Sequence, residues 1–458
     1  MGLTASLAAL RFRPHQMPPG AARQERVRLG STFGLRAIVA RLAVGLLASS
    51  TVLGAVSFVP AAAVHAMVPA VGTSANFEVL DDAQYDVMPG LSCQNPTAPM
   101  PCYTPHQIRT AYNMESVING GTTGAGQTIV IIAGFQDPTL LTDLARFDQT
   151  FGLPATTPLV TAPDGLTEFD PSSAIQKGWA LEIATDVEWA HAIAPGATIH
   201  LVLAASGDDA DILRATRYAV ENDLGDVISQ SFGEAESCPT AEFLAEEHAV
   251  FKAAHARGMT LLASSGDVGA AERTCDGTLV AAVSTPASDP EVTAVGGTRL
   301  VADRVSGAHQ SEVAWNDQYG ASGGGFSQVY KRPGYQAPFI EDNTGRGIPD
   351  VALGASMYGA VIVAFRGKFG RVIGTSPATA QWAGIAALSN EMAGHRQGPL
   401  NTRLYHVGKS SSYDAAFHDI TGGENTFAGF SGLPAGPGWD PVTGLGSPNV
   451  AVLLPLLS

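Results

Sequence analysis

Two acidic residues stand four positions apart in a segment that is otherwise apolar. Glu182 and Asp186 fall on one face of a helix predicted over 179–194, because side chains four residues apart lie one above the other. No Lys or Arg occurs between Lys177 and Arg214 to neutralise them locally. Like charges on one face repel, so we expect the pKa of at least one carboxyl to be raised. Such a pair can act as a general base, but it can equally be a solvated acidic face or be neutralised by a distant Arg.

A serine lies where a second helix is predicted to begin. Ser376 follows Gly374-Thr375 and precedes Pro377, and small residues continue the helical pattern through Leu388. The simple interpretation is a helix N-cap with Pro at the first helical position. The chemical interpretation is a nucleophile, because the backbone N–H groups and dipole of a helix start favour the oxyanion that forms on attack. A hydroxyl nucleophile needs a base, and since none of the eleven His stands in a His-Gly-Thr setting, the acidic pair is the available one.

An aspartate follows a third buried segment. Asp267 ends the stretch Ser264-Ser265-Gly266-Asp267, at the carboxyl end of a strand predicted over 259–265. It can be no more than a turn residue. In acid it can also stay protonated and donate a hydrogen bond to a developing oxyanion, as a buried carboxylic acid can.

A parallel sheet is the element that would bring these three segments together. Five short runs are almost continuously apolar, which is typical of strands covered on both faces, and longer helical patterns separate them. The runs are 128–133, 198–204, 226–231, 259–265 and 292–295. The order predicts an α/β fold with a doubly wound, mainly parallel sheet and helices on both faces, in which reactive groups gather at the carboxyl ends of the strands.

Taken in order, the motifs resemble those of the sedolisin, or serine-carboxyl peptidase, family, whose fold is subtilisin-like. The stretches that carry chemistry are Glu182-x-x-x-Asp186, Ser265-Gly266-Asp267 and Gly374-Thr375-Ser376. Supporting stretches that are similar to the family are Tyr103-Thr104-Pro105, Ala111-Tyr112-Asn113, Pro286-Ala287-Ser288, Val292 to Thr298, Ser322 to Ser327 and Arg346 to Asp350. Each motif alone is weak, but their joint occurrence in order over 102–458 is specific.

The resemblance implies a secreted, acid-acting serine endopeptidase that works through a Ser-Glu-Asp triad and an acyl-enzyme. Ser376 would be the nucleophile, Glu182 the general base and acid, Asp186 the residue that orients Glu182, and Asp267 the oxyanion-hole partner. The chemistry agrees, because a carboxylate base works in acid where His would be protonated. One alternative is a tripeptidyl-type exopeptidase, which would need a cleft closed at one end. Another is a binding protein on an inactive peptidase fold, against which the intact set of four residues argues.

A Gly-rich stretch is predicted to bind substrate. Gly320-Ala321-Ser322-Gly323-Gly324 also fits the G-x-S-x-G pattern of α/β-hydrolases, but it is not placed as a sharp strand-to-helix turn. We interpret the stretch as a loop on which an extended peptide pairs with main chain, because glycines permit that approach. The substrate-binding residues would be Ser231, Gly323, Gly324 and Gly325.

The C-terminal stretch resembles the calcium loop of the family. The resemblance implies one Ca²⁺ ion, held by the carboxylates of Asp419 and Asp440 and the main-chain carbonyls of Ile420, Gly436 and Gly438. Hard oxygen donors from tight turns suit calcium. The spacing is not that of an EF-hand, so an ordinary Asp/Gly loop is the alternative.

Composition and charge restrict the class of protein. The 458 residues are 45% hydrophobic and 15% charged, which is typical of a globular protein with enough apolar material for one large core or two ordinary ones. Residues 1–66 hold seven Arg and one acidic residue, so 19 basic and 41 acidic residues follow, and this remainder carries −22. Such a surface repels phosphate backbones, which argues against nucleic acid as a partner. We expect a monomer whose partner is a protein or peptide substrate.

The N-terminus is typical of an export signal. An Arg-rich stretch ends at Arg41, an apolar run covers 42–63, and Val64-His65-Ala66 offers a cleavage site. We therefore predict a signal peptide over 1–66, a short linker over 67–101 in place of the large prodomain usual in the family, and a peptidase domain over 102–458. The apolar run is also long enough to be an uncleaved anchor, the one case in which the protein would contact a membrane.

Four cysteines in an exported chain favour disulfides. They stand at positions 93, 102, 238 and 275. Proximity in sequence favours Cys93 with Cys102 and Cys238 with Cys275, although three connectivities are possible.

Overall fold

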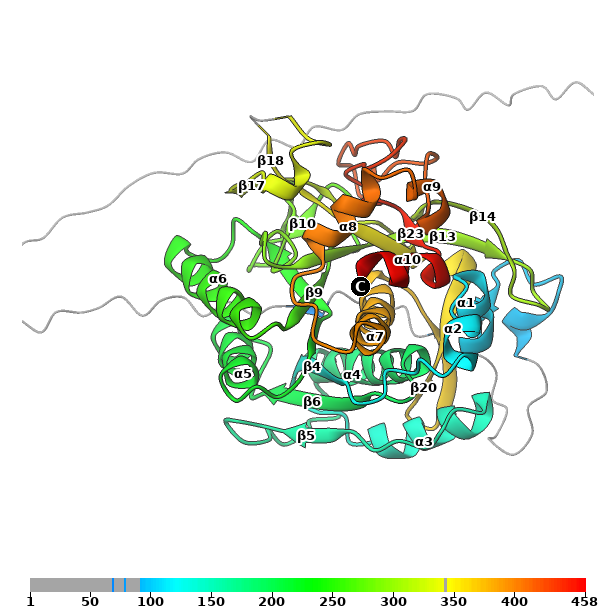
Figure 1. Cartoon of the computed structure of the whole chain (residues 1–458). Helices are drawn as coiled ribbons and strands as arrows, with labels where there is room; N and C mark the ends of the chain where they lie inside the picture. Colours follow the sequence, from blue (N-terminus) through cyan, green and yellow to red (C-terminus); the bar gives the residue numbers. More distant parts are fainter. Residues whose placement is uncertain (1–67, 70–77, 80–90, 342–343) are drawn as a thin grey trace, which may run out of the picture. The chain divides into compact units, whose positions relative to one another are not determined.

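The computed structural model describes residues 68–69, 78–79, 91–341 and 344–458 (Figure 1). The contacts group the chain into one unit of Met1–Ala61 and a second of Ala62–Ser458, and every described residue belongs to the second. The predicted signal peptide, 1–66, and most of the predicted linker, 67–101, lie outside the described residues. Within the described ranges, no helix has the length and apolar character needed to cross a membrane.

A mainly parallel sheet of eight strands forms the centre of the fold. Its order is β14-β13-β9-β7-β4-β6-β5, with β19 paired to β13 as well. Every pair is parallel except β13 with β14. The strands are β4 (Thr128–Gly134), β5 (Leu159–Thr161), β6 (Thr198–Ala204), β7 (Val227–Gln230), β9 (Thr260–Ser264), β13 (Thr293–Ala302), β14 (His309–Ala314) and β19 (Val351–Gly354). All five predicted strands are present, and β13 extends beyond the predicted 295 because it continues into a hairpin with β14.

Helices on both faces complete the predicted α/β architecture. α4 and α7 pack on β4, β7, β9 and β13, and α5 and α6 pack on β4, β6 and β9. The helices are α1 (Pro105–Ala111), α2 (Glu115–Asn119), α3 (Leu140–Phe151), α4 (Ala174–Ile193), α5 (Asp209–Glu221), α6 (Ala241–Ala256), α7 (Thr375–Ala393), α8 (Asn401–Gly408), α9 (Tyr413–Ala416) and α10 (Val450–Leu457). α4 begins five residues before the predicted start, because the Ser173 side chain caps it by accepting a hydrogen bond from the Gln176 N–H.

Smaller sheets and both predicted disulfides surround this centre. The four-stranded sheet β2-β21-β20-β3 packs on α3 and α4, where Trp189 Nε1 donates to Ile362 O at 2.9 Å. The pairs Cys93–Cys102 and Cys238–Cys275 are disulfide-bonded, which confirms the predicted pairing. The remaining elements are β1 (Val68–Pro69), β2 (Glu78–Val79), η1 (Ser92–Gln94), β3 (Cys102–Tyr103), β8 (Phe232–Ala235), β10 (Glu272–Arg273), β11 (Leu279–Val280), β12 (Ser284–Thr285), β15 (Asn316–Asp317), β16 (Gly320–Ala321), β17 (Gly325–Lys331), η2 (Gly334–Gln336), β18 (Gly345–Ile348), η3 (Met357–Gly359), β20 (Ala360–Phe365), β21 (Lys368–Val372), β22 (Phe417–His418) and β23 (Ser447–Pro448).

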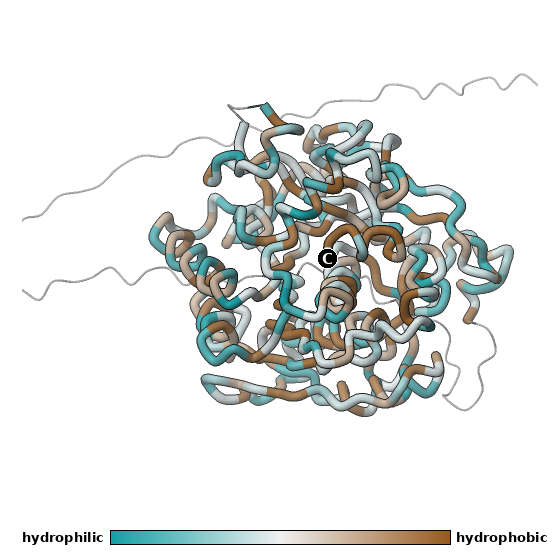
Figure 2. The backbone as a smooth tube through the Cα atoms, viewed as in Figure 1, coloured by the Kyte–Doolittle hydropathy of each residue, from teal (hydrophilic) through white to brown (hydrophobic). Residues whose placement is uncertain are grey.

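The core lies between the sheet and its helices. Figure 2 shows apolar residues along the central strands, while hydrophilic residues are frequent on the peripheral helices α5 and α6. Four tryptophans are among the largest fully buried side chains, namely Trp179, Trp189, Trp315 and Trp382. Two of them belong to α4 and one to α7, so the helices that carry Glu182, Asp186 and Ser376 are packed tightly inside the core.

Candidate active site

Glu182 and Asp186 lie on a part of α4 that is buried all round. Their exposed fractions are 1% and 0%, so the interpretation of the pair as a solvated acidic face is wrong. The helix is buried because it is apolar on every side and packs closely on α7 (Figure 1). Gly384 of α7 makes this approach possible, because a Cβ there would lie 2.6 Å from the Ile193 side chain of α4.

The environment of Asp186 agrees with the expected pKa shift. Burial raises its pKa above the ordinary value, and a hydrogen bond from the Ser231 hydroxyl opposes part of that rise. The Ser231 Oγ donates to Asp186 Oδ1 at 2.8 Å. The same Oγ lies 3.5 Å from the main-chain oxygen of Ser376. The acidic helix and the start of α7 therefore meet at one hydroxyl.

Ser376 lies in the first turn of α7 and is not its N-cap. The helix begins at Thr375, and Gly374 is the N-cap with a φ of 117°. The predicted N-cap role of Ser376 is therefore wrong, because the positive φ of Gly374 lets the chain turn into the helix two residues earlier. Ser376 is fully buried, and among the residues that the structure describes its Oγ has no hydrogen-bond partner. The hydroxyl is thus not engaged in capping.

Asp267 is hydrogen-bonded to Thr375, the residue before the candidate nucleophile. Its Oδ1 accepts hydrogen bonds from the Thr375 N–H at 2.7 Å and from Thr375 Oγ1 at 2.9 Å. The Gly266 N–H donates to the same Thr375 Oγ1 at 3.2 Å. A Cβ on Gly374 would lie 2.5 Å from Asp267 Oδ2, so only glycine fits beside this carboxyl. The two segments that were predicted to supply the nucleophile and the oxyanion partner are therefore neighbours.

The Gly-rich stretch runs beside the Asp267 segment. Gly323 donates from its N–H to Gly266 O at 2.7 Å, and its carbonyl accepts the Ser265 hydroxyl at 2.7 Å. A side chain at Gly323 would collide with the main chain of Ser265 and Gly266. Ser322, the serine of the G-x-S-x-G pattern, donates to Val442 O and accepts from the Gly297 N–H. Because its hydroxyl is committed to these bonds, Ser322 is unsuited to be a nucleophile.

Two of the predicted calcium ligands, Asp419 and Gly438, contact the hydroxyl of Tyr413. Tyr413 Oη lies 3.0 Å from Asp419 Oδ1 and 3.3 Å from Gly438 O. Burial, and then the carboxylates of Asp419 and Asp440, raise the pKa of Tyr413. Gly438 N–H donates to Asp419, and Gly436 N–H donates to Asp440. Burial raises the pKa of Asp440 to about 6. The donor set consists of oxygens only and fits calcium, although no group of three or more His, Cys, Asp or Glu that could hold a metal occurs in the described part of the chain.

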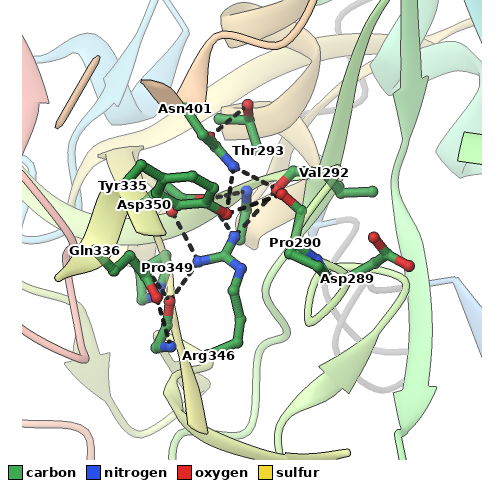
Figure 3. Close-up of polar contacts among 12 residues, drawn as sticks. Asp289, Pro290, Val292, Thr293, Tyr335, Gln336, Arg346, Pro349, Asp350 and Asn401 are labelled. Carbon is green, nitrogen blue, oxygen red and sulfur yellow. Dashed lines mark hydrogen bonds and ion pairs between the residues drawn. The ribbon is translucent and has the colours of Figure 1, made fainter. Parts of the chain in front are cut away.

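A buried ion pair between Arg346 and Asp350 lies among the strands β13, β18 and β19 (Figure 3). Arg346 and Asp350, which are fully buried, pair through both guanidinium ends at 2.6 and 2.8 Å. Asp350 Oδ2 also accepts the Ala294 N–H of β13, and Tyr405 of α8 donates to Oδ1. The pair joins β18, β19, β13 and α8, so the family motif over 346–350 has a structural role and is not part of the catalytic group.

Sequence reasoning missed Thr375, and it predicted Ser231 as a substrate-binding residue without its contact to Asp186. Thr375 fixes Asp267, and the Ser231 hydroxyl joins Asp186 to Ser376 rather than facing solvent. The only signal for Thr375 was its position between Gly374 and Ser376. For the Ser231 contact there was none, because its partner is 45 residues away in sequence.

The comparisons with known proteins point to one family. Residues 178–401, which contain all four candidate catalytic residues, match the Subtilase family. The chain is 35% identical to kumamolisin of Bacillus sp. (strain MN-32) over 361 residues, which cover 76% of this chain and 62% of that protein. It is 30% identical to tripeptidyl-peptidase 1 of Homo sapiens over 385 residues, which cover 77% of this chain and 64% of that protein. The chain thus spans less than two thirds of the length of these relatives.

A solved structure extends the similarity to the fold. The structure of Pseudomonas sedolisin, a serine-carboxyl proteinase complexed with two molecules of pseudo-iodotyrostatin, superimposes with a TM-score of 0.68 and 27% identity. The superposition covers 78% of this chain and 98% of that structure. The subtilisin-like arrangement of sheet and helices described above is therefore shared.

Proposed function

Because the chain belongs to the sedolisin family of subtilisin-like peptidases, we propose that it is a serine endopeptidase that cleaves peptide bonds in acid through an acyl-enzyme on Ser376. The observation that carries the proposal is the meeting of three segments at the start of α7. Asp186 reaches it through Ser231, Asp267 reaches it through Thr375, and Ser376 lies there with an uncommitted hydroxyl among the described residues.

In the proposed first half-reaction, Ser376 Oγ attacks the carbonyl carbon of the scissile bond. Glu182 takes the hydroxyl proton, and Asp186 orients Glu182 and shares its charge. The carbonyl oxygen becomes an oxyanion, to which a protonated Asp267 donates. The intermediate then collapses, the C–N bond breaks, and Glu182 returns the proton to the leaving amine.

In the second half-reaction, water replaces the amine. Glu182 takes a proton from water while the hydroxide attacks the ester of Ser376, and the proton then returns to Ser376 Oγ as the acid product leaves. Both halves need an ionised Glu182 and a protonated Asp267, so we propose an acid optimum. Extended substrate would pair with the main chain of Gly323, Gly324 and Gly325, which lies beside the Asp267 segment.

The test is Ser376→Ala, which we expect to abolish hydrolysis of a denatured protein while the fold persists. Ser389→Ala is the matched control, because Ser389 is also a buried serine of α7 but bonds Gln397 at the other end of the helix. We expect the control to keep its activity. Full activity in folded Ser376→Ala protein would exclude the proposed mechanism.

Exopeptidase action is the second candidate, favoured by the 30% identity to a protein named tripeptidyl-peptidase 1. Peptides of equal sequence with free and acetylated N-termini distinguish the two. An endopeptidase cleaves both at internal bonds, whereas a tripeptidyl peptidase releases tripeptides from the free form alone.

We further propose that one Ca²⁺ binds Asp419, Asp440 and the carbonyls of Ile420, Gly436 and Gly438. The ion would neutralise these two carboxylates, which both act electrostatically on Tyr413. We also propose that the protein is secreted after cleavage of residues 1–66 and that it acts as a monomer on protein or peptide substrates.

A further inference from the structure

The Ser231 hydroxyl occupies the junction between the acidic pair and the nucleophile helix. Ser231 directly follows β7, which packs on α7, and its hydroxyl reaches Asp186 of α4. Its Oγ lies 2.8 Å from Asp186 Oδ1 and 3.5 Å from the main-chain oxygen of Ser376. A hydroxyl has only one proton to donate, and the carboxylate oxygen of Asp186 is both closer and the stronger acceptor of the two. Asp186, Ser231 and Ser376 are each at most 1% exposed, so the hydrogen bond from Ser231 to Asp186 is buried.

The Ser231 hydroxyl is the hydrogen-bond partner that the structure gives Asp186, because the other titratable groups near α4 are engaged elsewhere. Of the elements packed on α4, the strands β1, β4 and β20 contain no titratable residue, and neither does β7, which directly precedes Ser231. On α4 itself, Glu182 lies one turn before Asp186. Glu188 accepts a hydrogen bond from the Ala364 N–H, and His191 contacts Pro154 O and Asp148. The titratable residues of the other elements packed on α4, namely α1, α3, β6 and α7, have partners other than Asp186. Their hydrogen-bond or ion-pair partners are as follows: Arg109 bonds Ala192 O, His106 bonds Glu115, Asp143 accepts from the Arg366 N–H, Asp148 pairs with His191, Arg146 bonds Gln149, His200 bonds Thr161, and Glu391 accepts from the Thr123 N–H. Lys177 lies in the first turn of α4.

We infer that Ser231 is a positioning residue for the proposed reaction, whose hydroxyl holds Asp186 Oδ1 so that the carboxyl stays turned toward Glu182 and the acidic pair keeps its negative charge. The inference rests on the proposed function. It differs from a role in substrate binding, which the main chain of Ser231 can still serve.

The direction of the pH effect follows from the hydrogen bond. Donation to Oδ1 favours the ionised form of Asp186, against the burial that favours the neutral form. Glu182 and Asp186 titrate as a pair, and the pair must lose a proton before it can accept the one from Ser376. Removing the Ser231 hydroxyl therefore raises the apparent pKa at which the Glu182–Asp186 pair loses this proton. The acid limb of kcat/KM therefore moves to higher pH, while the alkaline limb, which depends on Asp267, stays in place.

The experiment compares wild type, Ser231→Ala and Ser231→Cys with the control Ser229→Ala. Ser229 is a buried serine of β7, and its Oγ has no hydrogen-bond partner among the described residues. Cysteine keeps the volume of the side chain but is a weak donor, so it carries the test if the alanine variant fails to fold. We expect kcat of the Ser231 variants to fall about tenfold to a hundredfold with KM unchanged, and the acid limb to rise by about one pH unit. Ser229→Ala should match wild type in both respects.

A second readout separates this inference from the proposed function. The carboxyl of Asp186, assigned in ¹³C NMR by its absence from Asp186→Asn, should titrate at higher pH in the Ser231 variants than in wild type. This measurement needs no turnover, so it tests Ser231 even if wild type hydrolyses no substrate and the proposed function fails. An unchanged carboxyl titration, or a rise in KM with kcat and the pH profile as in Ser229→Ala, would overturn the inference.

Discussion

The two carboxyl oxygens of Asp267 have different surroundings. Oδ1 accepts from the Thr375 N–H and from the Thr375 hydroxyl, whose own oxygen is occupied by the Gly266 N–H. An oxygen that accepts two hydrogen bonds is not the one that carries a proton. When Asp267 is protonated, the proton therefore belongs on Oδ2, which lies against Gly374 and so next to the predicted nucleophile segment.

This arrangement makes position 374 sensitive to substitution, because an added Cβ would press on the Asp267 carboxyl. Gly374→Ala adds a Cβ 2.5 Å from Asp267 Oδ2 in a backbone with φ 117°, so Asp267 must move. We expect kcat to fall about a hundredfold, because such displacements of a positioned group are costly. Gly394→Ala is the matched control at the other end of α7. Gly394 has a φ of 71° and open space where the Cβ would be added. The Gly394→Ala variant should therefore lose about 1–2 kcal/mol to backbone strain without disturbing the site. Equal kcat in the two variants would contradict the argument.

Asp267→Asn separates proton donation from charge. An amide still donates but does not ionise, so we expect the variant to be slower at the optimum and to lose activity less steeply as pH rises. Asp267→Ala, which lacks a donor, should lose about 10²–10³ in kcat. Rate profiles of folded protein, checked by circular dichroism at each pH, measure the effect. A profile of Asp267→Asn that declines in parallel with wild type would remove Asp267 from the oxyanion role.

The types of the four candidate catalytic residues were predictable, but the contacts between them were not. The spacing of Glu182 and Asp186 follows from the helix repeat, which is local. The bonds from Ser231 to Asp186 and from Thr375 to Asp267 cross 45 and 108 residues. Such contacts depend on how the strands are ordered in the sheet, which a single sequence does not specify.

At the scale of elements, the strands were predicted better than the helix start. Continuous apolar runs located β4, β6, β7 and β9 to within a residue or two because parallel strands are buried on both faces. The sequence predicted α7 to begin at Pro377, with Ser376 as its N-cap, because Pro favours the first helical position. The structure begins the helix at Thr375, since the positive φ of Gly374 supplies the turn.

The loop that ends at Asp440 should depend on calcium for its stability. Asp419 and Asp440 both act electrostatically on Tyr413, and a cation bound to them would neutralise their charge, so adding Ca²⁺ to metal-free protein should raise Tm. At a calcium concentration of one hundred times Kd the gain is about 2.7 kcal/mol. Asp419→Asn should lose this response. Asp414→Asn, which changes a neighbouring carboxylate outside the predicted ligand set, should keep it. If calcium does not change the Tm of the wild-type protein at the working pH, the proposed calcium site is wrong.

At the scale of the whole molecule, buried carboxyls gather between α5, α6, β8 and β10. Asp209, Glu234, Glu247 and Glu272 come from these four elements, and each is at most 7% exposed. Burial and the neighbouring carboxyl of Asp209 raise the pKa of Glu234. Glu272 also touches the site, because its Oε2 lies 2.5 Å from where a Cβ of Gly266 would be. The four positions span more than sixty residues of sequence, so the cluster was not predictable from any local pattern.

This cluster should make the fold unstable at neutral pH. Burial, with Asp289 nearby, raises the pKa of Glu247 from 4.5 to about 8, and burial raises that of Glu272 from 4.5 to about 7. A carboxyl whose pKa is higher in the folded state contributes stability that is complete below 4.5 and is lost as pH rises through the folded value. The free energy of unfolding, measured by denaturant at a series of pH values, should therefore fall between 4.5 and about 8.

Glu247→Gln should flatten that decline, because the amide has the same shape and does not ionise, and the difference from wild type should reach the order of 2–4 kcal/mol near neutrality. Glu246→Gln is the matched control on the same helix, since Glu246 is exposed and pairs with Arg217 at the surface. It should follow the wild-type decline. A fold that is equally stable in acid and at neutral pH, or a Glu247→Gln variant that loses stability as steeply as Glu246→Gln, would show that these carboxyls do not govern the pH range of the protein. In that case an activity loss above acid pH would have to come from the site itself, through Asp267.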